Sequence, residues 1–164
     1  MIPVSVSWRT EKMFRRPDVR KVVRLAVCAA ENAGTGLDER SALGVSFVSS
    51  EKMAAVNHDF LNHAGDTDVI CFDYRSGEDA GFGETGVDIL ICPAVALREA
   101  RKRGLPYARE VTLYLVHGLL HAAGCDDLKP ELKRKMRRAE RRVMKALEAE
   151  FDLSSIFECG EDQQ

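Results

Sequence analysis

Apolar and polar positions in this chain follow a two-residue period in some segments and a helical period in others. Short apolar or alternating runs predict four strands, and stripes of apolar residues spaced three and four apart predict five helices. The strands are expected at residues 2–8, 43–48, 68–74 and 87–92. In the last helix the stripe consists of Leu132, Met136, Ala139, Val143 and Leu147.

Proline, serine and glycine mark the expected helix boundaries. Proline is accepted in the first turn of a helix, serine caps an N-terminus, and glycine ends a helix in a left-handed conformation. The five helices are therefore expected to begin at Pro17, at Ser49 or Ser50, at Pro93, at Pro106 and at Pro130. The first four are expected to end near Gly34 or Gly36, near Phe60, near Gly104 and near Gly124.

The order of these elements predicts an α+β fold. It reads strand, helix, strand, helix, strand, strand and then three helices, which favours a single mixed four-stranded sheet packed against about five helices. A single domain is expected over residues 1–153, with a flexible acidic tail at 154–164. The Gly-, Glu- and Asp-rich stretch at 76–86 lacks the lysine of a phosphate-binding loop, and we expect a plain turn there.

Composition favours a soluble protein of the cytoplasm. Of the 164 residues, 45% are hydrophobic and 30% are charged, as in globular domains. No apolar run approaches the length of a membrane span, and the N-terminus lacks the apolar stretch of a signal peptide. Five widely spaced cysteines form no Cys-x-x-Cys pair, which indicates reduced thiols.

Basic residues are concentrated near the last helix, although the net charge is −2. Residues 129–145 hold nine basic side chains and two acidic ones, and a second cluster lies at 98–109. Such a run is either a solvated outer face or a surface for phosphate backbones. In the second interpretation, Arg134, Arg138 and Arg141 are expected to contact those phosphates.

Candidate chemistry is concentrated in residues 116–127, Val-His-Gly-Leu-Leu-His-Ala-Ala-Gly-Cys-Asp-Asp. His117 and His121 are four apart, so both imidazoles lie on one helix face and reach one ion. Gly124 can end this central helix, after which Asp127 can turn back as a third ligand. Two nitrogens and a carboxylate suit zinc, and three protein ligands leave a fourth position open, as in catalytic sites.

Two other interpretations of this motif are weaker. The histidines could be ordinary polar residues, but the helix around them is apolar, and buried imidazoles need partners. The spacing also resembles that of His-Glu-x-x-His zinc proteases, in which the glutamate is the general base. Gly118 stands at the glutamate position, so the metal site survives while the chemistry of a metalloprotease or amidohydrolase loses its base.

Three stretches of the chain resemble the YbeY family of metal-dependent endoribonucleases. Residues 67–72 are similar to its Thr-Asp-Val-Leu-Ser-Phe strand, and residues 87–92 to its Gly-Asp-Ile-Val-Ile-Ser strand. The most specific stretch is 117–127, which resembles His-Gly-x-Leu-His-Leu-x-Gly-Tyr-Asp-His. Order and spacing agree over nearly the whole chain to about residue 153.

The resemblance implies cleavage of single-stranded RNA in the maturation of ribosomal RNA and in ribosome quality control, with the small ribosomal subunit as partner. It also implies one ion, most simply zinc, on His117, His121 and Asp127. Asp127 replaces the family's third histidine; aspartate binds zinc but leaves it a weaker Lewis acid. Leu61 replaces an arginine that the family often uses toward RNA phosphate.

Two residues are candidates for the missing chemistry. His63 is a candidate for proton transfer or phosphate contact, with an exposed loop histidine as the equal alternative. Arg75 could replace the missing arginine, or be an ordinary solvated arginine. Thr67 and Asp68 are expected to hold the start of the third strand near the ion. A non-catalytic, metal-stabilised module that associates with the ribosome is a further alternative.

Overall fold

The structure, a computed structural model, describes residues 1–75 and 86–160. Its strands are β1 (Val4–Arg9), β2 (Ala42–Val48), β3 (Val69–Asp73) and β4 (Gly86–Ile91). Its helices are α1 (Val19–Ala33), α2 (Ser50–Leu61), α3 (Pro93–Arg103), α4 (Tyr107–Ala122) and α5 (Pro130–Glu150), followed by the 3-10 helix η1 (Leu153–Ser155). The turn predicted at 76–86 lies outside the described residues, apart from Gly86, which begins β4.

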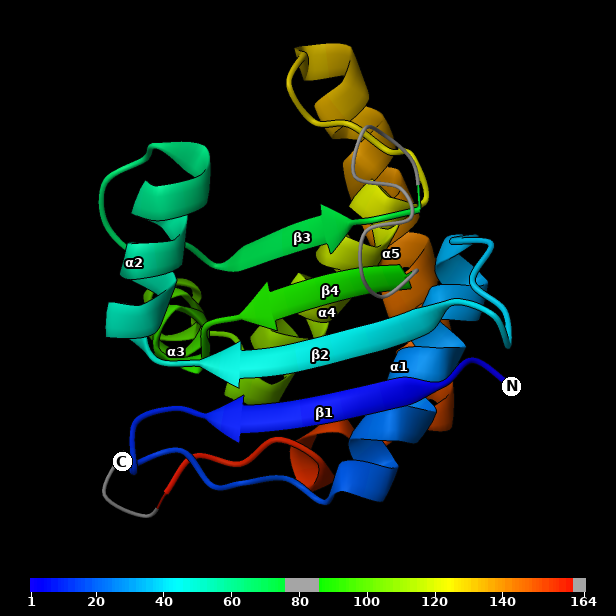
Figure 1. The fold of residues 1–164 in the computed structure, drawn as a ribbon. Helices are drawn as coiled ribbons and strands as arrows, with labels where there is room; N and C mark the ends of the chain where they lie inside the picture. The colour runs from blue at the N-terminus through cyan, green and yellow to red at the C-terminus, as the bar shows by residue number, and fades with distance from the viewer. Residues whose placement is uncertain (76–85, 161–164) are drawn as a thin grey trace.

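The four strands form one mixed sheet with the order β1-β2-β4-β3. The pairs β1–β2 and β2–β4 are parallel, whereas β3 runs antiparallel to β4 at the edge of the sheet (Figure 1). The predicted α+β fold with one four-stranded mixed sheet is therefore confirmed.

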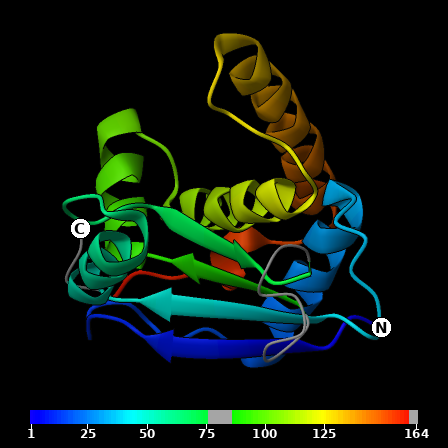
Figure 2. The same cartoon turned by 45° about the horizontal axis from the view of Figure 1, so that its top comes forward.

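Helix α4 lies at the centre of the helical layer. It packs against β3 and β4 and also against α1, α3 and α5. Figures 1 and 2 show α1, α4 and α5 on one side of the sheet, with the N-terminal half of α5 extending beyond it. Most of α4 is buried, including Val111, Leu115 and Leu119. No helix in the described ranges is both long and apolar enough to cross a membrane.

Most helix boundaries follow the predicted capping chemistry. The Ser49 hydroxyl accepts the backbone N–H of Lys52 at 3.1 Å, and α3 and α5 begin at their prolines. At α1 the prediction was wrong by two residues, because Asp18 is the N-cap and its carboxylate accepts the N–H of Arg20 at 2.8 Å. A side-chain acceptor thus determines this boundary, and proline only precedes it.

Gly118 allows α4 to lie close to the sheet. A Cβ at this position would stand 3.0 Å from Ile89 Cγ2 and 3.2 Å from Val69 Cγ2. Both distances are shorter than ordinary carbon–carbon contacts, which favour about 3.5–4.0 Å. Only the hydrogen atom of a glycine fits at this distance, so Gly118 has a packing role against β3 and β4.

The C-terminal segment packs against the body of the fold. Ile156 and Phe157 are buried, and the Phe157 ring lies 5.6 Å from that of Phe47. Phe14 and Cys159 form an isolated antiparallel β-bridge, and the N–H of Gly160 donates to the carbonyl of Met13 at 2.9 Å. Up to residue 160 this acidic segment is therefore packed against the fold by two apolar side chains, and the flexibility expected from residue 154 stays a prediction. Residues 161–164 lie outside the described range.

We predict that Phe157→Ala lowers the free energy of unfolding by about 3–5 kcal/mol, as expected for a buried phenylalanine. Glu158→Ala is the matched control, since its ion pair with Arg15 is exposed and contributes less than about 1 kcal/mol. Chemical denaturation of both variants measures the difference. Equal, small effects would show that the segment after residue 153 is not anchored.

Candidate metal centre

His117 and His121 are held side by side on α4. They are one turn apart, and their Nε2 atoms are 3.0 Å apart. The side chains are 22% and 33% exposed, so the pair is half-buried at the helix surface and reachable from solvent. The helix thus presents two imidazole nitrogens to one point in space.

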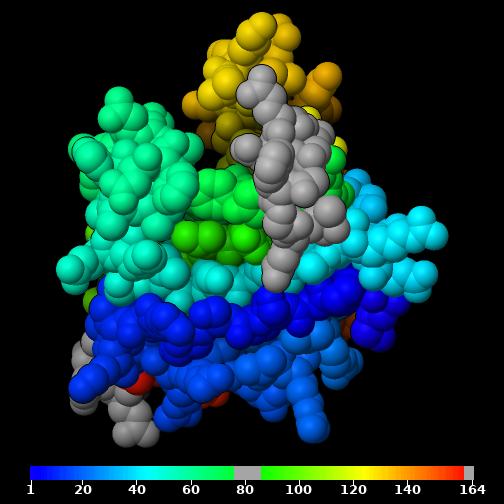
Figure 3. All heavy atoms as spheres, viewed as in Figure 1, coloured from blue at the N-terminus to red at the C-terminus, as the bar shows by residue number. Residues whose placement is uncertain are grey.

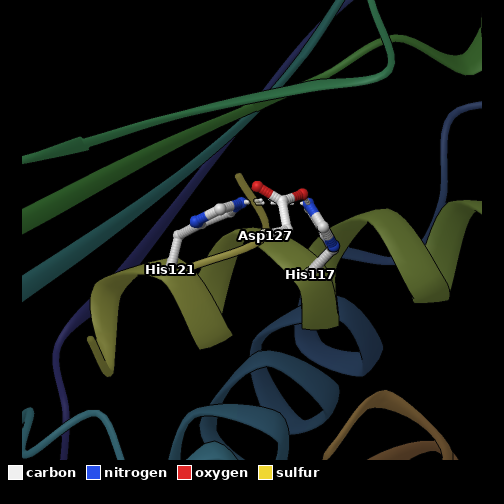
Figure 4. Close-up of side chains that lie close together, drawn as sticks. All are labelled: His117, His121 and Asp127. Atoms are coloured by element: carbon white, nitrogen blue, oxygen red, sulfur yellow. Dashed lines mark hydrogen bonds and ion pairs between the residues drawn. The ribbon is translucent and has the colours of Figure 1, made fainter. Parts of the chain in front are cut away.

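A tight turn after α4 brings Asp127 back over the histidines. The chain leaves the helix at Gly124, whose φ of +97° is in the left-handed region that favours glycine. The Asp126 carboxylate then accepts the backbone N–H groups of Asp127 at 2.7 Å and of Leu128 at 3.1 Å. Figure 4 shows the result: the Asp127 carboxylate points to the space between the two imidazoles.

The three side chains have the spacing of ligands around one ion. Asp127 Oδ2 is 3.4 Å from His117 Nε2 and 3.8 Å from His121 Nε2. Ligands about 2.0–2.1 Å from a tetrahedral zinc ion are about 3.4 Å from one another. The distances and the two-nitrogen, one-oxygen donor set fit a divalent ion, so the residues predicted to share an ion do lie together.

Glu140 of α5 is a member of the site that sequence reasoning missed. Its Oε1 is 2.6 Å from Nδ1 of His117, across 23 residues of sequence. A carboxylate in this place fixes the ring orientation and leaves Nε2 free to bind a metal. The only available signal was that Glu140 is one of two acids in a run of nine basic residues.

The protonation of His117 reflects the same contact. Burial by itself lowers the pKa of this imidazole, but the hydrogen bond and charge of Glu140, with the charges of Asp68 and Asp127, raise the pKa above its usual value. The surrounding carboxylates therefore favour positive charge at this position, whether from a proton or from a cation.

A cleft of about 530 Å³ opens beside His117. Its walls come from α3 and from the N-terminal half of α5, which stand on either side of α4 in Figure 2. Thr67 and Asp68, at the start of β3, line the cleft together with His117, Asp127 and Glu140. In Figure 3 the surface is hollowed above β3, between α2 and α5. The cleft gives a substrate access to His117 and Asp127.

Position 118 faces away from this cleft. Gly118 is buried against Ile89 and Val69 of the sheet, so a side chain there would point into the sheet and not toward a ligand of the histidines. Position 118 therefore cannot replace the glutamate of a His-Glu-x-x-His protease: it carries no carboxylate, and a side chain there would point away from the histidines.

The Arg75 side chain forms hydrogen bonds within the protein that connect separate elements. Its guanidinium pairs with both oxygens of Asp73 at 3.0 and 2.9 Å, and it donates to the carbonyls of Thr35 at 2.5 Å and Ala122 at 2.7 Å. These contacts connect β3 to the C-terminal ends of α1 and α4. Arg75 does not line the cleft, and its nearest link to the histidines is through the end of α4.

His63 and Leu61 are not brought to the metal ligands. Asn62, with φ of +54°, ends α2, and His63 follows as an exposed residue outside the cleft lining. Leu61 is 44% exposed. Asp88 of β4 also points away from the metal ligands. Its neighbour Ile89 faces α4, so Asp88 lies on the opposite face of the sheet, over Gly44. The catalytic role of His63 stays a prediction.

Comparison with known proteins identifies the family of this chain. The family model "Endoribonuclease YbeY" matches residues 6–148. A protein of that name from Salinispora tropica is 34% identical over 137 residues, covering 77% of this chain and 87% of its own. One from Elusimicrobium minutum is 33% identical over 130 residues, covering 78% and 87% respectively.

A solved structure supports the fold. The solution structure of TM1509 from Thermotoga maritima aligns with a TM-score of 0.58 at 20% identity, covering 89% of this chain and 91% of that one. With the family match over most of its length and a site built from the family's most specific motif, this chain belongs to the YbeY family of endoribonucleases.

Proposed function

We propose that this protein is a metal-dependent endoribonuclease that cleaves single-stranded RNA, with one zinc ion on His117, His121 and Asp127. The single observation that carries the proposal is the triangle of His117 Nε2, His121 Nε2 and Asp127 Oδ2, with sides of 3.0, 3.4 and 3.8 Å at an open cleft. Membership of an endoribonuclease family supplies the reaction class.

The protein's own residues position the reaction. A bound divalent ion supplies Lewis acidity toward the phosphodiester. His117, His121 and Asp127 would hold it, and Glu140 orients the His117 ring through Nδ1. Three protein ligands would leave a position open for water or substrate, and the cleft reaches His117 and Asp127.

We further propose ribosomal RNA as the substrate, the small ribosomal subunit as the partner, and a role in ribosome quality control. The support is the resemblance in three motifs. We place the activity in the cytoplasm, which the five free cysteines favour. For Arg75 we propose a positioning role, since it holds the carbonyl of Ala122 next to His121; His63 stays a candidate for proton transfer.

We predict that the zinc-loaded protein cleaves a single-stranded RNA oligomer and that His117→Ala lowers the rate about 10³-fold or more. The reason is that metal assistance contributes several kcal/mol, at about 1.4 kcal/mol for each factor of ten. The measurement is product formation on a denaturing gel. His58→Ala is the matched control, because His58 is exposed and its side chain pairs with the neighbouring Asp59. Cleavage of casein but not RNA would contradict the proposal in favour of a peptidase.

We predict that Asp127→Ala weakens zinc binding more than 100-fold, because Asp127 is a proposed ligand. A residue that only orients a ligand has a smaller effect, roughly 10–100-fold. Zinc at about 100 times its Kd stabilises by about 2.7 kcal/mol, which raises the Tm by about 5–10 °C in a chain of this size. Asp127→Ala should lose this rise, and Asp127→His should keep it. An undiminished rise in Asp127→Ala would exclude Asp127 as a ligand.

Glu140→Ala is predicted to weaken zinc binding about 10–100-fold, because the His117 ring loses its orienting acceptor. Glu140→Gln retains an acceptor oxygen and should bind within about tenfold of the parent. Isothermal titration with zinc gives both values, and Glu131→Ala, an exposed acid in the first turn of the same helix, is the control. Parent-like affinity in Glu140→Ala would show that the contact is incidental.

A further inference from the structure

Three cations line the cleft beside the metal centre. Arg103 comes from the end of α3, and Lys133 and Arg137 come from the N-terminal half of α5. They face the same cleft as His117 and Asp127, which is where an RNA backbone would lie. The question is which of them is available to a phosphate.

Arg103 already has acidic partners. Its guanidinium nitrogens are 3.8 Å from Glu99 and 3.9 Å from Glu110, whose carboxylate is buried. Lys133 and Arg137 differ, because within residues 1–75 and 86–160 their side chains form neither an ion pair nor a hydrogen bond. Both are exposed and line the cleft, so they are the cations that an incoming anion can pair with.

The geometry of α5 relates these two cations to the metal centre. Lys133, Arg137 and Glu140 are spaced i, i+4 and i+7, which places them on one helix face. Glu140 contacts His117 directly. Along the helix axis, Arg137 is about 4.5 Å and Lys133 about 10.5 Å from Glu140. The two cations therefore form a short track that leads from solvent to the ligands of the ion.

A polyanion needs these two cations to bind in the cleft, because the cleft lining also carries several negative charges. Four carboxylates (Asp68, Glu99, Asp127 and Glu140) and three cations line it, which gives −1 for the protein alone. A divalent ion changes this sum to +1. Without Lys133 and Arg137 the sum would be −3 for the protein and −1 with the ion, so the cleft would repel a polyanion.

We propose that Lys133 and Arg137 form a phosphate subsite that binds the RNA backbone next to the bond that is cleaved. The inference rests on the proposed endoribonuclease function and adds the residues that hold its substrate. The Arg137 guanidinium suits two oxygens of one phosphate, and Lys133 provides a point charge one turn further out. Together they supply the positive charge that Leu61, where the family often has an arginine, does not.

The subsite differs from the one expected from the sequence. Each residue advances a helix by about 100°, so Arg138 lies about 100° around α5 from Arg137, and Arg141, four residues on, lies about 40° from it. Neither lines the cleft, and Arg134 lines only a neighbouring hollow of the described residues, which it shares with Lys133 and Arg137. Arg138 and Arg141 thus make a matched control pair with the same helix and the same charge.

The test measures binding of a fluorescein-labelled oligothymidylate 12-mer to the zinc-loaded protein by anisotropy across a range of KCl concentrations. This DNA carries the same phosphates and is not a ribonuclease substrate. Each phosphate contact contributes about 0.7 to the slope of log K against log salt for a single strand. Lys133→Ala and Arg137→Ala should each reduce the slope by about 0.7 and weaken binding about three- to tenfold at low salt. The double variant Arg138→Ala/Arg141→Ala should bind like the parent.

A second arm separates this inference from the proposed function. In RNA cleavage, Lys133→Ala and Arg137→Ala should raise KM about three- to tenfold with kcat within twofold, since the subsite holds a phosphate that does not react. RNA cleavage with unchanged slope and KM in both variants would overturn the subsite while leaving the endoribonuclease in place. An equal slope loss in the control pair would also overturn it. Slope losses confined to Lys133 and Arg137 without RNA cleavage would contradict the proposed function and support the subsite.

Discussion

The close contact between α4 and the sheet at Gly118 determines the direction of the two histidines on which the candidate site depends. A helix advances about 100° per residue, so a helix pressed onto β3 and β4 at residue 118 turns residues 117 and 121 about 60–100° away from the sheet. That direction is toward the cleft between α3 and α5. With Ile89 Cγ2 only 3.0 Å from the position of a Cβ, a larger side chain would require α4 or the sheet to move, and the imidazoles with it.

Helix α5 contributes both negative and positive side chains to the cleft around the candidate metal centre. Glu140 holds the His117 ring at 2.6 Å, and Lys133 and Arg137 lie on the same face toward the solvent end of the helix. Met136 and Val143 are buried and fix the rotation of α5 on the rest of the helical layer. One apolar stripe thus decides which charged residues of a strongly basic helix reach the cleft and which remain on the outer surface.

The two departures from the common family pattern act in the same electrostatic direction. Asp127 in place of a histidine adds a negative charge among the proposed ligands, and Leu61 in place of an arginine removes a positive charge. Each change makes the surroundings of an RNA phosphate less favourable. In the proposed subsite, Lys133 and Arg137 of α5 would offset this loss of positive charge.

The sequence by itself determined the α+β fold, the order of the elements and that His117, His121 and Asp127 would lie together. These follow from local chemistry: the period of apolar residues, the prolines, serines and glycines at helix ends, and two histidines one turn apart before Gly124. It failed where a contact joins distant segments. Glu140 and His117 are 23 residues apart, Arg75 reaches Thr35 and Ala122, and Phe157 is buried against Phe47 beneath an acidic terminus. Only the tertiary structure decided these pairs, because the packing of α5 and of the C-terminal segment against the other elements sets their distances, and no local period encodes that packing.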